Sequence, residues 1–292
     1  MPIRSAVVGF TSEPYTCEVS TRMLLAYAAG IGETNPCYFD DASALGIVAH
    51  PAFCVTLEWP VALSMRQHPP CALPRQEAIR AVHAEQDSTF HRPIRPGDRL
   101  RTTGTLIQVR TVKPGAFVVT KYDTVDATTQ APVVTSYAST IYRGVAVDGA
   151  DARIEDVPCF TLVNNDTSRA QQVALYVPRQ APHVYTECAR IWNPIHTERR
   201  VALEAGLPDI ILHGTATWAL AASHVIHSCA GGDPTRLRRF SGRFNAMVIP
   251  GTTLALHYHS SWDEPQTVSY TVYNAEGAAA ITRGVAIFAA TP

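Results

Sequence analysis

The chain has 292 residues, of which 46% are hydrophobic and 17% charged, and its formal net charge is −1. It has neither the basic stripe nor the high isoelectric point of a nucleic-acid-binding protein, and it has no apolar run long enough for a secretory signal or a membrane span. This length accommodates one large core or two domains of about 150 residues each, and the composition favours a small, partly apolar molecule as the partner.

The cysteines predict a reduced protein without a structural metal. Seven occur, an odd number, and no two form a CxxC pair; they stand at positions 17, 37, 54, 71, 159, 188 and 229. Free, mostly buried thiols fit a reducing compartment, so we expect a cytoplasmic protein, or a peroxisomal one in a eukaryote. His224 and His227 lie one helical turn apart but lack a third ligand, and no metal site is predicted.

In the first half, a short helix is predicted over about 19–30 and a turn at Asn35-Pro36, because the residue before proline is pushed out of the helical region. A loop leads to His50 and to a second helix, AFCVTLEWPVALSM, which Pro60 should kink or interrupt. VVTKYDTVDA and PVVTSYASTIYRG are rich in β-branched and aromatic residues, as antiparallel strands are. The polar segment VDGADARIEDVP predicts a linker near 145–160.

The second half shows the same order. A helix is predicted over about 180–191, then a turn at Asn193-Pro194, then a long apolar helix, GTATWALAASHVIHSCA, which Gly231 and Gly232 stop. TLALHYHSSW, TVSYTVYNA and AAITRGVAIFAA read as strands. One long apolar helix followed by a meander of strands predicts an α+β unit in which a curved antiparallel sheet wraps the helix.

Three short matches in the same order indicate a duplicated unit. Asn35 and Asn193 are 158 positions apart, His50 and His213 are 163 apart, and the glycines of FHRPIRPGDRL and FNAMVIPGTTL are 154 apart. The offsets agree within loop-sized insertions, so the chain is predicted to consist of two homologous halves, 1–150 and 151–292.

The segment WNPIHTERRVALEAGLPDIILHGTA resembles the MaoC-like (R)-specific enoyl-CoA hydratases, which include the hydratase unit of peroxisomal multifunctional enzymes. Asn193, Pro194, His196, His213 and Gly214 match their motif, Asp-x-Asn-Pro-x-His followed by His-Gly at the start of the central helix. GRFNAMVIPGTTL resembles the strand that follows, and HAEQDSTFHRPIRPGD resembles the equivalent stretch of the degenerate half. The resemblance implies a double hot dog with the two sheets joined edge to edge, one working site in a tunnel between the halves, and a homodimer.

The resemblance also implies a role for each matching residue. His196 would be the general base or acid, Asn193 would hold a water or its own turn, and the Gly214 N–H would bind the thioester oxygen at the start of a helix. His213 and Thr215 would contact the substrate. Each residue also has a plainer structural reading: His196 as a satisfied polar residue, His213 as a helix cap, Asn193 as a turn residue and Gly214 as a close-packing glycine.

One departure from the motif matters. The motif Asp, five residues before His196, is Ile191, and in the first half the same positions hold Glu33 and Tyr38. Glu33 and Tyr38 are therefore interpreted as structural or tunnel-lining. Three replacements for the lost acid are open: Glu187, if it reaches the site from one helical turn back; His196 acting alone; or a reaction that needs one base.

The predicted function is hydration or dehydration of an enoyl or 3-hydroxyacyl thioester by a lyase of fatty acid or polyketide metabolism. The thioester is carried by CoA or by a carrier protein, whose phosphopantetheine belongs to the substrate, and no other cofactor is implied. Arg238, with its neighbours Arg236, Arg239 and Arg243, is predicted either to meet the phosphates of that arm or to form a solvated strand edge. The alternatives are a one-base isomerase or epimerase in specialised metabolism, and a non-catalytic acyl-thioester-binding module.

Overall fold

The computed structural model describes residues 1–69, 71–158, 170–261 and 266–290. The first half contains β2 (Tyr15–Glu18), α1 (Thr21–Gly30), α2 (Cys54–Gln67), β3 (Ala81–Phe90), β4 (Arg99–Val112), β5 (Gly115–Asp126) and β6 (Pro132–Arg143). The second half contains β9 (Gln171–Val177), α4 (Ala181–Ala189), α6 (Gly214–Ala230), β10 (Leu237–Phe244), β11 (Thr252–Ser261), β12 (Thr267–Tyr273) and β13 (Ala279–Phe288). Short elements complete it: β1 (Ile3–Arg4), α3 (Arg75–Ala78), β7 (Val147–Asp148), β8 (Ala152–Arg153) and α5 (Arg199–Glu204).

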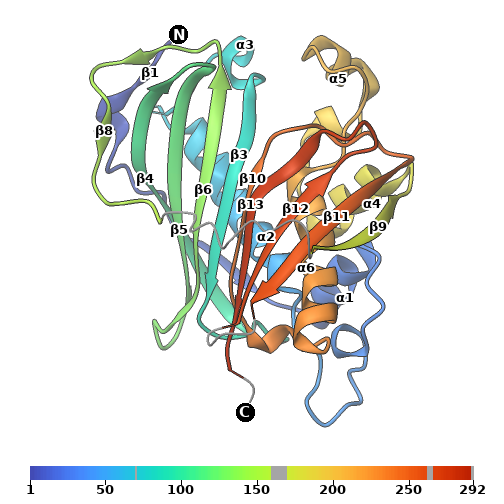
Figure 1. Ribbon diagram of the computed structural model, residues 1–292. Coiled ribbons are helices and arrows are strands. Elements are labelled where there is room, and N and C mark those ends of the chain that lie inside the picture. The colour runs from blue at the N-terminus through green and yellow to red at the C-terminus, as the bar shows by residue number, and fades with distance from the viewer. Residues whose placement is uncertain (70, 159–169, 262–265, 291–292) are drawn as a thin grey trace.

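Apart from β1 and β7, which pair in parallel with each other, the strands form one large antiparallel sheet in which the halves repeat each other. Its order is β2-β4-β5-β6-β3-β10-β13-β12-β11-β9, with β8 added on β4. Read inward from either edge, both halves have the same topology, and α2 and α6 lie on one side of the sheet (Figure 1). The prediction of an α+β double hot dog with edge-to-edge sheets is confirmed.

The two halves meet where β3 pairs with β10. Asp87 pairs with Ser241, and Gln86 with Gly242. Asp87 and Ser241 are 154 positions apart, the offset that also relates the two strand-leading glycines of the repeat. Because equivalent residues face each other there, a local twofold axis passes through this point of the seam.

The central helices form because their sequences are apolar on nearly every side. Trp218, Ala219, Ala221, Ala222 and Val225 of α6 are all completely buried, as expected for a helix enclosed by a sheet. The left-handed backbone of Gly231 ends α6, as predicted.

Pro60 does not interrupt the first-half helix, so that part of the prediction is wrong. The helix α2 continues from Cys54 to Gln67 with Pro60 inside it. Pro60 removes a single backbone donor, and the buried surroundings hold the helix together.

Part of the predicted linker and one cysteine, Cys159, lie outside the described residues. The other six cysteines are free; Cys17, Cys54 and Cys229 are buried and the remaining three are partly exposed. Within the described residues, no helix is both long enough and apolar enough to cross a membrane.

Candidate active site

A cavity of about 390 Å³ lies between the two halves. The second half contributes His196, His213, Gly214 and Thr215, and the first half contributes one face of α2. This volume is within the range of sites that hold small organic ligands. A second cavity of about 520 Å³ adjoins it. Both are lined by Ala62, Arg66, Tyr122 and Thr140.

His196 presents an unprotonated nitrogen toward this cavity. The short 3-10 helix Pro194–His196 places its ring, and Nδ1 lies 2.8 Å from the carbonyl oxygen of Ile211. A carbonyl only accepts, so Nδ1 carries the proton and Nε2 keeps its lone pair. Burial lowers the pKa of His196 to about 4, although the bond to Ile211 acts in the opposite direction. The imidazole is therefore neutral near pH 7 and is able to take a proton.

His213 stacks on His196 and holds it in place. The two ring centroids are 3.7 Å apart and the planes are inclined by 23°. His213 Nε2 lies 3.4 Å from the Ile191 carbonyl and 3.3 Å from the Thr186 hydroxyl, so this nitrogen carries the proton. Burial and the neighbouring His196 both keep the pKa of His213 well below its ordinary value. His213 thus forms a neutral, rigid wall behind the base.

Gly214 opens α6 and offers a free backbone donor. The His213 carbonyl accepts from the amides of Ala216 and Thr217, which fixes the helix start at this point. The first amides of a helix have no partner within it, and within the described chain no acceptor is found for Gly214 N–H. A Cβ on Gly214 would lie 3.2 Å from the ring of Phe244. The missing side chain therefore keeps this donor accessible, and the helix dipole favours negative charge beside it.

A line of hydroxyl groups orients Thr215. Tyr185 donates to Thr215 Oγ1 over 3.1 Å, and its own oxygen lies 3.4 Å from the hydroxyl oxygen of Tyr27. Tyr27 donates to the carbonyl of Ala52 over 2.8 Å. Because Thr215 accepts from Tyr185, its hydroxyl proton is free to point into the cavity.

Asn193 and Ile191 also line the cavity. The Asn193 side chain does not cap the turn that follows it. Its first-half counterpart Asn35 does, accepting from Cys37 N and donating to the Gly232 carbonyl. The amide of Asn193 is therefore available to a bound molecule. Ile191 is buried, and it places an aliphatic surface where the family motif has an acid.

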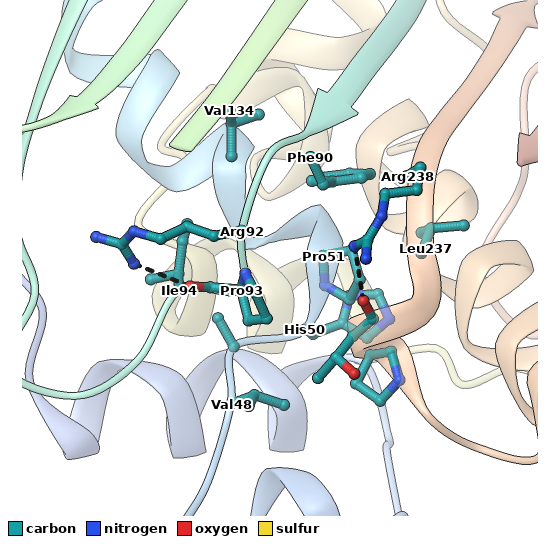
Figure 2. Close-up of a pocket in the computed structure, with 13 residues that line it drawn as sticks. Val48, His50, Pro51, Phe90, Arg92, Pro93, Ile94, Val134, Leu237 and Arg238 are labelled. Carbon is teal, nitrogen blue, oxygen red and sulfur yellow. Dashed lines mark hydrogen bonds between the residues drawn. The ribbon is translucent and has the colours of Figure 1, made fainter. Parts of the chain in front are cut away.

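The equivalent place in the first half is nearly closed. A hollow of about 20 Å³ lies there. His50, Pro51, Phe90 and Arg238 are among the side chains that line it (Figure 2). This space suits one water and excludes a thioester. Pro51 has no N–H, and the Ala52 N–H is bound by His50 Nδ1, so this helix start offers no free donor.

Tyr38 stands where the second half has His196. Its ring packs against His50 at 5.4 Å, and it is buried. In the described structure its hydroxyl has no hydrogen-bond partner. Glu33, at the acid position, lies 4.0 Å from His50 Nε2. Neither residue lines the large cavity, so the prediction that Tyr38 binds substrate in the tunnel disagrees with its position.

Two more predicted residues lie away from the cavity. The side chain of Glu187 is exposed on α4, whereas Tyr185 and Thr186 are buried, and the cavity wall does not include Glu187. Arg238 is exposed on β10 and donates to the carbonyl of Thr235 at the small hollow (Figure 2).

The other arginines of that group do not mark a solvated strand edge either. β10 is an inner strand, paired with β3 on one side and β13 on the other. Arg239 forms a bidentate ion pair with Asp87 across the seam, and Arg243 lies 3.9 Å from Glu85. These contacts hold the halves together rather than forming a site for phosphates.

Sequence reasoning overlooked several polar residues on the cavity wall, among them Glu58 of α2 and Gln86 of β3. Glu58 is 6% exposed and Gln86 is fully buried. The signal was present, because Glu58 is the one charged residue in the apolar run AFCVTLEWPVALSM.

Family models match both halves of the chain. Residues 6–136 match the model of the FAS1-like dehydratase domain region, and residues 168–275 match that of the MaoC like domain. The crystal structure of a MaoC-like dehydratase from Phytophthora capsici superimposes with a TM-score of 0.81, covering 96% of each chain at 21% identity. The first half thus matches a dehydratase region and the second half a MaoC like domain, on a fold that resembles that of MaoC-like dehydratases.

Curated relatives match over shorter segments. The fatty acid synthase beta subunit pigK of Monascus ruber is 40% identical over 74 residues, which is 25% of this chain and 4% of that protein. The peroxisomal enoyl-CoA hydratase 2 of Arabidopsis thaliana is 43% identical over 63 residues, 22% of this chain and 20% of the plant protein. The alignments thus span a fifth or less of these relatives' own length.

Proposed function

We propose that this protein is a lyase that hydrates a (2E)-enoyl thioester or dehydrates the corresponding (3R)-3-hydroxyacyl thioester. The observation that carries this proposal is the pairing, on one cavity, of an unprotonated His196 Nε2 with the free Gly214 N–H at a helix start. A base removes the proton alpha to a thioester, and an oxyanion donor beside it stabilises the enolate that forms. The names of the relatives, an enoyl-CoA hydratase and a fatty acid synthase subunit, support the same reaction class.

In the dehydration direction, His196 Nε2 removes a proton from C2, and the electron pair moves onto the thioester oxygen. Gly214 N–H and the N-terminus of α6 stabilise the enolate that forms. The enolate then re-forms the carbonyl, C2 and C3 become doubly bonded, and the C3–O bond breaks. The imidazolium of His196 returns its proton to the departing hydroxyl, so water leaves and His196 is neutral again. Hydration runs through the same steps in reverse.

One base suffices for this scheme because both transfers occur on one face of the substrate. Ile191 has no proton to give, and Glu187 is exposed outside the cavity. Thr215, held by Tyr185, and Asn193 are placed to hold the water or hydroxyl between C3 and His196. Of the three replacements for the lost acid, this arrangement favours His196 acting alone.

The cavities suggest how the rest of the substrate lies. The acyl chain extends from His196 along α2 toward the adjoining cavity, while the thioester carrier, CoA or a carrier protein, stays outside. The total space suits a medium or long acyl group. A homodimer, and a cytoplasmic or peroxisomal location, stay predictions.

Ile191 favours a second candidate. A site with one base and an enolate-stabilising donor also fits double-bond isomerisation or epimerisation alpha to a thioester. In that case His196 takes the proton from one carbon and returns it to another, or to the other face of the same carbon, and no water is lost.

A panel of enoyl-CoA and 3-hydroxyacyl-CoA esters of increasing chain length tests the proposal. We expect loss of enoyl absorbance with at least one ester, and a 3-hydroxyacyl product by mass spectrometry. A product isomeric with the substrate would support the isomerase instead. Tight binding without turnover of any ester would identify a binding module and overturn the lyase proposal.

A further inference from the structure

The wall of the cavity that faces His196 from the first half carries a buried carboxylic acid. Val55, Glu58, Trp59, Ala62 and Arg66 line the cavity, and their spacing of three and four residues places them on one face of α2. Of the described residues that line this cavity, Glu58 is the one carboxylic acid. An acid is unexpected on the central helix of an acyl-binding fold, because burying it costs free energy unless it is paired.

Glu58 is held by a network of neutral groups. Gln86 Nε2 donates to Glu58 Oε2 and to the Ser88 hydroxyl, each over 3.1 Å, and the hydroxyl oxygens of Ser88 and Ser136 are 2.8 Å apart. No cation of the described chain forms an ion pair with Glu58. Burial raises the pKa of Glu58, which favours the neutral acid. A neutral acid both donates and accepts hydrogen bonds.

One hydrogen-bond acceptor of this network has no partner within the described structure. Gln86 is completely buried, and within the described structure its Oε1 has no partner. A buried acceptor without a donor is costly, and such groups are rare in native proteins. Glu58 and Gln86 together therefore offer a donor and an acceptor to a molecule in the cavity.

The second half provides an internal comparison. Counted from His50 and His213, the α6 residue that corresponds to Glu58 is Ala221, which is completely buried. A small apolar side chain is therefore compatible with this position of the fold, and packing alone does not demand an acid.

Beyond Glu58 the wall becomes mainly hydrophobic, with Arg66, Tyr122 and Thr140 lining both cavities. The adjoining cavity is lined mainly by hydrophobic side chains, among them Ile3, Val7, Met65, Leu73, Leu106 and Val118. An acyl chain running from His196 along α2 would thus pass Glu58 and Gln86 before its end reaches a pocket with a mainly hydrophobic wall.

From this arrangement, and resting on the proposed function, we propose that the substrate's acyl chain carries a hydroxyl group beyond the reacting carbons, which Glu58 and Gln86 bind. The hydroxyl donates to Gln86 Oε1 and accepts the proton of Glu58. A hydroxyl fits better than a carbonyl oxygen, which only accepts, or a carboxylate, which would bring a negative charge without a partner. The substrate class is a hydroxylated acyl thioester rather than a plain fatty acyl thioester.

The experiment compares a straight-chain (2E)-enoyl-CoA with the same ester carrying one hydroxyl at successive positions from C5 to the chain end. For the wild-type protein we expect kcat/KM for at least one hydroxylated ester to exceed that of the plain ester by about ten- to hundredfold. Glu58→Leu should bring the two values close together, chiefly by lowering that of the hydroxylated ester. Glu58→Gln, which keeps hydrogen bonding, should retain most of the preference. Glu13→Leu, at an exposed position, is the matched control and should behave as the wild type.

Two results would overturn the inference: a plain ester preferred over every hydroxylated one, or an equal loss with both substrates in Glu58→Leu, which would make Glu58 catalytic or structural. Dissociation constants of the saturated plain and hydroxylated acyl-CoA esters, measured by calorimetry, separate this inference from the proposed function. If no ester is turned over but the hydroxylated one binds about tenfold tighter in a Glu58-dependent way, the inference holds and the lyase proposal fails.

Discussion

Tyr27 and Tyr185 occupy equivalent positions 158 residues apart, and their hydroxyl oxygens lie 3.4 Å from each other where α1 meets α4. Gly30 and Cys188 also meet there, and a Cβ on Gly30 would come within 2.5 Å of Cys188 Cβ. The duplicated halves thus touch at equivalent residues, yet the two tyrosines serve different purposes. Tyr27 donates to a backbone carbonyl of its own half, whereas Tyr185 donates to Thr215 on the cavity.

Replacing each tyrosine by phenylalanine should separate these purposes. Tyr185→Phe removes the donor that orients Thr215, and we expect kcat/KM to fall about fivefold, the equivalent of one hydrogen bond of about 1 kcal/mol. Tyr27→Phe should destabilise the fold by a similar amount but affect kcat/KM less. Steady-state kinetics and urea unfolding measure the two effects. Equal losses of kcat/KM would contradict a specific link from Tyr185 to Thr215.

Gly214→Pro should remove the oxyanion donor while keeping the helix. Proline is tolerated at the first position of a helix, and Pro51 already occupies the corresponding place in the first half. We expect kcat to fall about 10²–10³-fold, the usual effect of losing one oxyanion donor. Gly214→Ala keeps the N–H and adds only the contact with Phe244, so it controls for steric effects. A similar loss in both variants would show that space, rather than the N–H, matters.

Glu187→Gln should leave turnover unchanged within about twofold. The carboxylate is exposed on α4 and is outside the cavity wall, so it has no route to the substrate. The rate with the best enoyl-CoA ester, measured against the wild type, provides the check. A hundredfold loss would return Glu187 to the catalytic acid role and would imply that α4 moves when substrate binds.

Acid should destabilise the protein over a defined pH range. Burial lowers the pKa of His50 to about 3 and that of His196 to about 4, whereas both titrate near 6.5 when unfolded. Below pH 6.5 the unfolded state therefore binds more protons than the folded state. The stability that the neutral histidines contribute is present above pH 6.5 and is lost as the pH falls toward 4. We expect a loss on the order of 2 kcal/mol per histidine between pH 7 and 5. Urea unfolding at several pH values measures it, and a flat profile over this range would be inconsistent with buried, neutral histidines.

The outline of this fold is readable in the sequence because its strongest signals are local. The apolar run Gly214–Ala230 and the alternating strands follow hydrophobic periodicity, and the repeated Asn-Pro and His positions reveal the duplication. β3 escapes such reasoning because its segment Gln86-Asp87-Ser88 is polar yet buried. Asp87 and Ser88 are bonded to partners distant in sequence, Arg239 and Ser136, which no local pattern reveals.

The residues of the candidate site also fall into those that the sequence predicts and those that it does not. His196, His213, Gly214 and Thr215 follow from one contiguous motif and converge on one cavity. Arg238 and Glu187 were inferred from residue type and helical spacing, and neither property determines which side of a strand or helix faces the cavity. Glu58 lies on the first-half helix α2, and only the folded structure places it on the same cavity as His196.

If His196 is the single base of a thioester lyase, the paired variants His196→Gln and His227→Gln should differ sharply. His227 is an exposed histidine on α6, so it controls for the substitution itself. With the best enoyl-CoA ester, we expect a loss of about 10²–10⁴ in kcat for His196→Gln, unchanged thermal stability and ester binding, and wild-type rates for His227→Gln. A His196→Gln protein that still turns over the ester within tenfold of the wild-type rate would contradict that role.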